Sequence, residues 1–375
     1  MNESTALAMQ DSEDSVRVVR DALEFRRPAR IPRCNFFLHY PPEWRERFGP
    51  EERHTDVSVW VATEGAFFTR ARRVKEEGEY VYDVDAWGRL IRSRSDAYFS
   101  EILEVPLGPG VDPDSIEFDS PLLAGRYLQN FGDAAAHDAA LAEARRKFHL
   151  FAKIGGPFHR TSFVRGEVQF LMDLATDVPL ARTLAEKVAD HLVAIGLEAL
   201  RRYDLYDTGI WIGDDMAFNQ RPMFSPRIFE EVFLPIYRSM VARFREAGAR
   251  FVVLHSDGNI TPFLEMLVDA GIDAINPVER RAGMDPYAIR RRFPRLSMIG
   301  GMCNTELLVH GPAAAIRDET RRLIELGREG GLVLGTHTIS AEVCTEHLAA
   351  YVETLDEEGV LEAEDAPRLK ARQLG

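Results

Sequence analysis

The chain alternates short apolar runs with longer amphipathic stretches, and this alternation is the feature that most constrains its fold. Seven runs of β-branched and aliphatic residues predict buried strands, at 31–38, 150–155, 209–213, 250–255, 272–276, 296–301 and 331–335. The segments between them predict amphipathic helices, several opened by proline, at 179–203, 226–247, 260–270, 286–293, 312–326 and 341–357. A repeated strand-then-helix order implies parallel strands joined by right-handed crossovers.

This order favours an α/β fold of the (β/α)8 TIM-barrel class over an open doubly wound sheet, although an eighth strand is not evident. The sequence contains no Gly/Ser-rich or Pro-rich linker, so we expect one barrel domain over residues 16–360. The predicted domain lies between a polar N-terminal tail, 1–15, and a polar C-terminal tail, 361–375. Residues 80–95 alternate around an Asp-Ala-Trp-Gly turn and predict a β-hairpin, inserted after the first strand, that caps one barrel mouth.

Composition excludes several classes of partner. The chain has 46 Lys+Arg against 60 Asp+Glu, a formal charge of -14, which disfavours binding to nucleic acid. Its three cysteines are too scattered for a disulfide framework, which favours a reducing compartment. We find no secretory signal and no apolar run approaching ~18 residues, so we expect a cytoplasmic protein without a membrane partner.

Polar side chains follow nearly every predicted strand at the point where the strand ends. These residues are Asp214, Asp215, His255, Asp257, Asn276, Cys303 and His337. Because TIM barrels build their active sites from the carboxyl ends of the strands, these side chains are expected to converge at one mouth. The sequence therefore predicts a site by position rather than by a single motif.

The donors at this mouth suit zinc, which prefers imidazole, thiolate and carboxylate ligands. His255 and Cys303 are suitable donors, and Glu167 offers a carboxylate in the loop after the second clear strand. His337 is a further candidate, and Asp257 is either a ligand, a partner that orients His255, or an ordinary turn residue. A lone histidine or cysteine at a strand end is also commonly a packed core residue, so this alternative stays open.

Further candidates concern catalysis and substrate binding. Asp214 and Asp215 are adjacent, so in an extended segment only one faces the barrel axis, while the other faces or caps a helix. With His337, they are the candidate proton donors. The candidate substrate-binding residues are Phe36, His39, Trp87, Arg160, Asn219 and Asn276. For the aromatic residues the alternative is core packing, and for the others it is surface pairing.

Together these segments resemble the uroporphyrinogen decarboxylase-like superfamily over roughly residues 16–360. The C-terminal half resembles it at His-Ser-Asp-Gly-Asn-Ile (255–260), Gly-Ile-Asp-Ala-Ile-Asn-Pro (271–277), Gly-Gly-Met (300–302) and Gly-Gly-Leu-Val-Leu-Gly-Thr-His (330–337). The upstream segments are similar to the corrinoid-dependent methyltransferase branch at Asp-Ala-Trp-Gly (85–88), Gly-Pro-Phe (156–158), Arg-Gly-Glu (165–167) and Asp214-Asp215. The resemblance independently implies a (β/α)8 barrel.

Within this superfamily the metal-free decarboxylases grip substrate carboxylates with paired arginines in an N-terminal loop. The matching stretch here, residues 31–40, has only Arg33. Thiol-methylating members hold zinc through a His-x-Cys pair and a later Cys. Here the pair reads His255-Ser-Asp257, and the later position falls near His337. The chain resembles methyl-ether demethylating members more closely, which implies zinc held by Glu167, His255 and Cys303.

The resemblance therefore implies a zinc-dependent methyltransferase that demethylates a small methyl ether or amine and passes the methyl group to a partner corrinoid (cobalamin) protein. A homodimer is also implied. Two alternatives remain open: a metal-free decarboxylase or lyase of a carboxylated, porphyrinogen-like substrate in which Arg160 and Arg165 bind the carboxylate, and a non-catalytic tetrapyrrole-binding protein.

Overall fold

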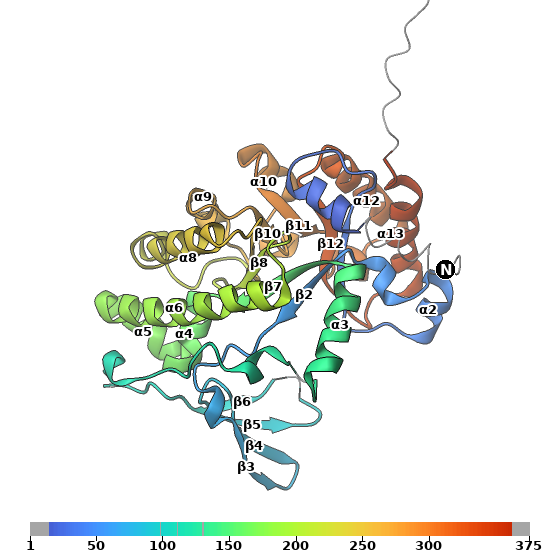
Figure 1. Ribbon diagram of the computed structural model, residues 1–375. Helices are drawn as coiled ribbons and strands as arrows, with labels where there is room; N and C mark the ends of the chain where they lie inside the picture. The colour runs from blue at the N-terminus through green and yellow to red at the C-terminus, as the bar shows by residue number, and fades with distance from the viewer. Residues whose placement is uncertain (1–14, 98, 111, 130, 362–375) are drawn as a thin grey trace, which may run out of the picture.

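A computed structural model of the chain describes residues 15–361 except 98, 111 and 130 (Figure 1). The predicted tails, 1–15 and 361–375, lie almost wholly outside the described residues. The main sheet consists of eight parallel strands: β1 (Arg33–Phe37), β2 (Val57–Val61), β7 (His149–Gly155), β8 (Ile210–Gly213), β9 (Val252–His255), β10 (Ala274–Asn276), β11 (Ser297–Gly301) and β12 (Leu332–Ile339). Their order, β1-β12-β11-β10-β9-β8-β7-β2, and the surrounding helices confirm the (β/α)8 barrel.

The eighth strand, missing from the sequence prediction, is β2. Its five residues, Val-Ser-Val-Trp-Val, pair in parallel with β7, from Val57 opposite His149 to Val61 opposite Lys153. β1 and β2 stand at the two ends of the hydrogen-bonded order. In the described part of the chain an isolated bridge between Cys34 and Thr55 joins this side of the barrel. The seam between β1 and β2 is therefore the least tightly paired part of the barrel wall.

Helices cover the outside of the barrel, and the six predicted helical segments are confirmed. The helices are α2 (Pro42–Phe48), α3 (Ala134–Lys147), α4 (Pro157–Arg165), α5 (Glu167–Thr176), α6 (Val178–Tyr203), α7 (Pro226–Ile228), α8 (Leu234–Glu246), α9 (Leu264–Asp269), α10 (Pro286–Arg292), α11 (Leu307–His310), α12 (Ala313–Gly327) and α13 (Thr345–Glu358). Proline in the first turn fits because the missing N–H has no partner there in any helix. Among the described helices, none is long and apolar enough to cross a bilayer.

The barrel interior is apolar toward the amino ends of the strands. Its buried members include Val57, Phe151, Trp211, Val253, Ile299 and Val333. Residues 15–23 are helical, and Val19 and Ala22 of this segment pack into the same cluster. A second, larger apolar layer lies between the strands and the outer helices. Since the amino end is filled in this way, the polar side chains of the barrel collect at the carboxyl ends of the strands.

The predicted hairpin is confirmed as β4 (Tyr80–Val84) paired antiparallel with β5 (Leu90–Arg94). It belongs to a four-stranded sheet completed by β3 (Arg72–Glu77) and β6 (Glu101–Glu104). The insertion follows β2 rather than the first strand, because β2, the strand that the sequence analysis missed, lies between β1 and the inserted sheet. In Figure 1 this sheet projects from one side of the barrel. It reaches the barrel cavity through Phe99, between β5 and β6.

Candidate active site at the barrel mouth

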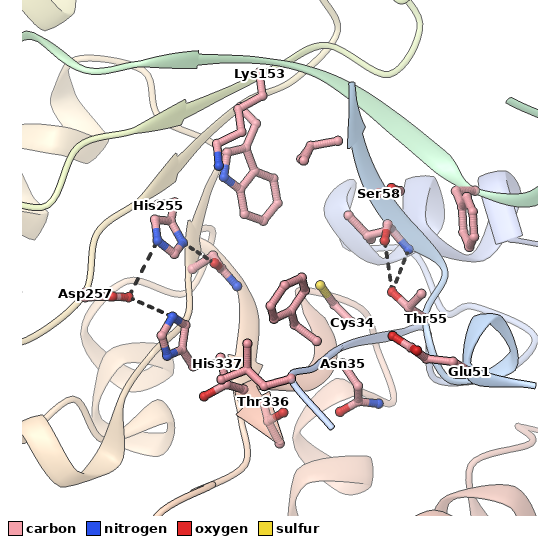
Figure 2. Close-up of a pocket in the computed structure, with 18 of the residues that line it drawn as sticks. Cys34, Asn35, Glu51, Thr55, Ser58, Lys153, His255, Asp257, Thr336 and His337 are labelled. Atoms are coloured by element: carbon pink, nitrogen blue, oxygen red, sulfur yellow. Dashed lines mark hydrogen bonds and ion pairs between the residues drawn. The ribbon is translucent and has the colours of Figure 1, made fainter. Parts of the chain in front are cut away.

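A cavity of about 890 Å³ opens among the carboxyl ends of the strands and along the seam between β1 and β2. Seven of the eight strands or the loops that follow them contribute side chains to it (Figure 2). Its lining includes Cys34, Phe36, Val59, Lys153, Trp211, His255, Asp257, Asn276, Thr336 and His337. A volume of this size suits a small-molecule ligand.

Two histidines and one aspartate form a compact donor cluster on one wall of the cavity. One ligand atom each from His255, Asp257 and His337 lies within 4.8 Å of the others. Asp257 Oδ1 lies between the two imidazoles, 3.5 Å from His255 Nε2 and 3.3 Å from His337 Nε2. Figure 2 shows both rings turned toward this carboxylate. The cluster depends on strand register, because His255 ends β9 whereas His337 lies near the end of β12.

The ring orientation of His255 is fixed by Asn276 at the end of the neighbouring strand β10. Asn276 Nδ2 donates to Ile299 O at 2.9 Å, so its Oδ1 is the atom that faces His255. His255 Nδ1 lies 2.6 Å from that oxygen and therefore carries the proton and donates. This leaves the Nε2 lone pair of His255 directed at the cluster, an arrangement typical of metal-binding histidines.

The turn that carries Asp257 is held by two further carboxylates. Asp257 N donates to Asp215 Oδ1 at 3.0 Å, and Gly258 N donates to Glu279 Oε2 at 2.6 Å. Asp215 Oδ1 also lies 3.8 Å from His255 Nε2, and Glu279 Oε1 lies 4.0 Å from His337 Nδ1. Asp215 and Glu279 therefore flank the donor cluster on either side and position its central residue.

Burial shapes the electrostatics of the site. It raises the pKa of the Asp257 carboxyl, and the nearby imidazoles of His255 and His337 oppose that rise. Beyond Asp215, the ring of His159 on α4 lies 3.6 Å from Asp215 Oδ2. Burial, followed by the charge of Arg160, lowers the pKa of His159 to about 4, so this imidazole is neutral near pH 7.

The donor cluster fits zinc. Two imidazole nitrogens and one carboxylate oxygen are the ligand set of many catalytic zinc sites, which keep a fourth position for water or substrate. Asp257 Oδ1 is buried without a hydrogen-bond partner, although it lies between two nitrogens that can each direct a lone pair toward the same point. A buried carboxylate oxygen without a hydrogen bond is costly, and a cation bound there offsets that cost.

Asp214, predicted as a proton donor, lies apart from the cavity. Its fully buried carboxylate accepts from His159 N at 2.6 Å, from Phe158 N at 3.2 Å and from the Tyr237 hydroxyl at 2.6 Å. It thereby caps the first turn of α4. Gly156 permits this contact, because a Cβ there would lie 2.2 Å from Asp214 Cγ. Of the two adjacent aspartates, Asp214 is therefore the one that caps a helix, and Asp215 is the one that faces the mouth.

The structure does not bring two of the predicted ligands into the donor cluster. Glu167 begins α5 with an exposed side chain, because Gly166, at a φ of 83°, ends α4 and redirects the chain. Cys303 is buried and lines a small adjoining recess with Glu279 and His337, but its thiol lies outside the group of close donor atoms. Of the expected set of Glu167, His255 and Cys303, only His255 therefore lies in the donor cluster, and its two neighbours there are Asp257 and His337.

The predicted substrate-binding residues divide into two groups. Phe36 and Asn276 line the cavity, and Asn276 also orients His255. The remaining four are engaged elsewhere: Trp87 is buried against Phe163, Arg160 pairs with Glu64, His39 packs against Trp44, and Asn219 is exposed in a loop. Tertiary packing decides this division, which local sequence does not reveal.

Four residues that surround the donor cluster or line its cavity escaped the sequence analysis: Lys153, Trp211, His159 and Glu279. Lys153 is one of only five lysines in the chain and interrupts the apolar run of β7. That interruption is the signal that was available. Trp211 lies in the middle of β8, and its ring lies 6.2 Å from that of His255. The sequence indicates a core residue at Trp211, because its neighbours in the strand are apolar.

Comparison with known proteins shows which family the chain belongs to. A solved methyltransferase from Methanosarcina mazei shares the fold, with a TM-score of 0.59 at 17% sequence identity, covering 92% of this chain and 98% of that one. No curated protein matches the sequence. The family described as uroporphyrinogen decarboxylase (URO-D) matches residues 126–358, well over half of the chain. The chain belongs to the uroporphyrinogen decarboxylase family.

Proposed function

We propose that this protein is a zinc-dependent methyltransferase that removes the methyl group of a small methyl ether or amine and passes it to a corrinoid protein. The observation that carries the proposal is the His255–Asp257–His337 cluster, whose central carboxylate oxygen is buried and has no hydrogen-bond partner. The fold shared with a methyltransferase from Methanosarcina mazei is consistent with it. Cavity and cluster together provide a place for a small substrate beside a metal.

The residues around the cavity divide the tasks of this proposal among them. His255, Asp257 and His337 hold the metal, and Asn276 keeps the Nε2 atom of His255 directed toward it. The chemistry that zinc supplies when bound there is Lewis-acid stabilisation of the charge on the departing oxygen or nitrogen. Trp211 and Phe36 provide apolar surface for the body of the substrate.

Asp215 is the acid–base group that we assign to the departing heteroatom. It is partly exposed at the mouth, and it lies close to both His255 and His159. His337 is a less suitable proton donor, because its Nε2 faces Asp257 and its Nδ1 faces Glu279. Asp214 is unsuitable because α4 and Tyr237 occupy both of its oxygens.

The test combines metal content with methyl transfer. Elemental mass spectrometry of the untagged protein is expected to give about one zinc per chain, lost in His255→Ala and Asp257→Asn. Methyl transfer from methoxybenzene, 4-methoxybenzoate or trimethylamine to free cob(I)alamin, followed by its absorption spectrum, is expected to require that zinc. Absence of zinc after reconstitution, or methyl transfer that is unchanged in both variants, would refute the proposal.

The structure weakens the support for the decarboxylase alternative. That reading assigns substrate carboxylates to Arg160 and Arg165, yet Arg160 pairs with Glu64 and Arg165 pairs with buried Asp173 at 2.6 Å. Neither guanidinium lines the cavity described above. The non-catalytic alternative, a tetrapyrrole-binding protein, predicts heme or cobalamin binding that survives His255→Ala, so the same variants test it.

A further inference from the structure

Lys153 is a cationic side chain that projects into the cavity from strand β7. In β7 it lies in register with Trp211 of β8, and Figure 2 shows its side chain reaching toward the part of the cavity where His255 lies. Among the described residues that line this cavity, Lys153 alone is a lysine or arginine. Its position two residues before the end of β7 brings it close to the donor cluster.

The carboxylates that interact electrostatically with Lys153 are bound to other groups. Its ammonium interacts electrostatically with Glu64, Asp215 and Asp257. Glu64, however, pairs with Arg160 and accepts from Gly155 N, while Asp215 and Asp257 hold the histidine cluster and its turn. Within the described residues, no carboxylate lies within ion-pair distance of Lys153. Its three N–H donors are therefore available to a ligand in the cavity.

A partly buried lysine at this position lowers the stability of the folded barrel, because its ammonium is desolvated. Burial, with the charge of Arg160, lowers its pKa, which is the sign of an ammonium that lacks full compensation. The buried or partly buried side chains around it, Phe151, Val59 and Trp211, are apolar and carry no such cost. Desolvated lysines without an ion pair are rare in proteins unless they have a function.

We propose that Lys153 binds a carboxylate of the substrate, and that this residue selects anionic over neutral substrates. This deepens the proposed function and rests on it only for the claim that the bound molecule is a methyl donor. The other carboxylates of the lining, Glu51 and Glu52, lie before the amino end of β2, whereas Lys153 is in register with Val61 at its carboxyl end. The anion is therefore placed at the end of the cavity nearest the metal cluster.

The rest of the cavity defines the body of that substrate. Trp211, Val59 and Phe36 present an apolar surface between the seam and the donor cluster. An aromatic or comparably flat apolar body suits such walls. The substrate class is therefore a small apolar carboxylate that carries a methyl ether or amine, rather than a neutral ether or a free trialkylamine.

The experiment compares two probes of equal shape and different charge. Isothermal titration calorimetry of protein stripped of metal with EDTA measures the dissociation constants of 4-methoxybenzoate and 4-methoxybenzamide. Metal-free protein is used because a carboxylate also binds zinc directly. We expect the benzoate to bind at least about tenfold more tightly, since a hydrogen bond to a charged group contributes more than a neutral one. Lys153→Met is expected to abolish that preference and to leave benzamide binding unchanged.

Two further variants are the controls. Lys153→Arg keeps the charge and is expected to keep the preference, which separates a loss of charge from a loss of folding. Lys75→Met removes an exposed lysine from β3 and is expected to change nothing. Equal binding of both probes to the unmodified protein, or a preference that survives in Lys153→Met, would overturn the proposal. The same holds if the only effect of Lys153→Met is a higher zinc affinity, because Lys153 then only offsets the negative charge of Asp215 and Asp257.

The outcome is separable from that of the proposed function. If the protein binds no zinc and transfers no methyl group, yet prefers the benzoate through Lys153, the methyltransferase proposal fails and the anion site stands. If zinc and methyl transfer are found without any charge preference, the anion site fails and the methyltransferase proposal stands.

Discussion

Replacing Tyr237 by phenylalanine tests whether Asp214 is an ionised helix cap in the folded protein. The Tyr237 hydroxyl donates to Asp214 Oδ2 at 2.6 Å, and both side chains are fully buried. Burial raises the pKa of Asp214 from its ordinary value of 3.8 to about 7, while the Tyr237 bond acts in the opposite direction. The variant removes a single oxygen and leaves the aromatic packing in place.

The sign of the pH effect follows from this pKa. Because the folded pKa lies above the unfolded one, stability contributed by Asp214 is fully present below about pH 4 and is lost as pH rises toward about 7. Tyr237 limits that loss by stabilising the ionised form. At pH 6 its removal costs one hydrogen bond to a mostly neutral acid, about 1 kcal/mol. At pH 9 it costs a bond to a buried carboxylate, about 2 to 3 kcal/mol.

Urea unfolding followed by circular dichroism at pH 6 and pH 9 measures the two values. Tyr351→Phe is a matched control, because the buried Tyr351 hydroxyl donates to the neutral amide oxygen of Asn35 at 3.0 Å. Its cost is expected to be about 1 kcal/mol at both pH values. If Tyr237→Phe shows the same cost at both, Asp214 does not ionise in this range and the reasoning fails.

Two further predictions concern the donor cluster. Asn276→Ala is expected to weaken zinc binding by about 10- to 100-fold while the fold is retained, because the His255 ring loses its orienting partner; competition titration with a fluorescent zinc chelator measures it, and unchanged affinity would contradict this role. Cys303→Ser is expected to retain zinc fully, because its thiol lies outside the group of close donor atoms; loss of zinc in elemental analysis would return Cys303 to the ligand set.

Several features of this protein could be read from the order of its residues. The positions of seven of the eight barrel strands and of six helical segments could be predicted from local periodicity. The reason is that the spacing of apolar residues along a strand or helix indicates which of its faces is buried. That the polar side chains at the strand ends meet was also predictable, since parallel strands bring their carboxyl ends to one mouth. His255, Asp215 and His337 were identified on this basis.

The eighth strand was not predictable on the same basis. β2 lacks the flanking glycines that mark the strands at 209–213 and 331–335. Pairing with β7 stabilises it, and that partner lies about 90 residues away in the chain. Its omission also misplaced the inserted sheet by one strand.

The tertiary structure alone decided which donor side chains lie together and which charged group enters the cavity. Asp257 becomes the central donor because Asp215 and Glu279, on two other strand ends, hold its turn between His255 and His337. Glu167 was equally suitable by residue type, but the turn at Gly166 places it on the outer surface. Lys153 acquires its significance because the nearby carboxylates pair elsewhere. The sequence determines which face of each element is buried, whereas the register between distant strands determines which side chains meet.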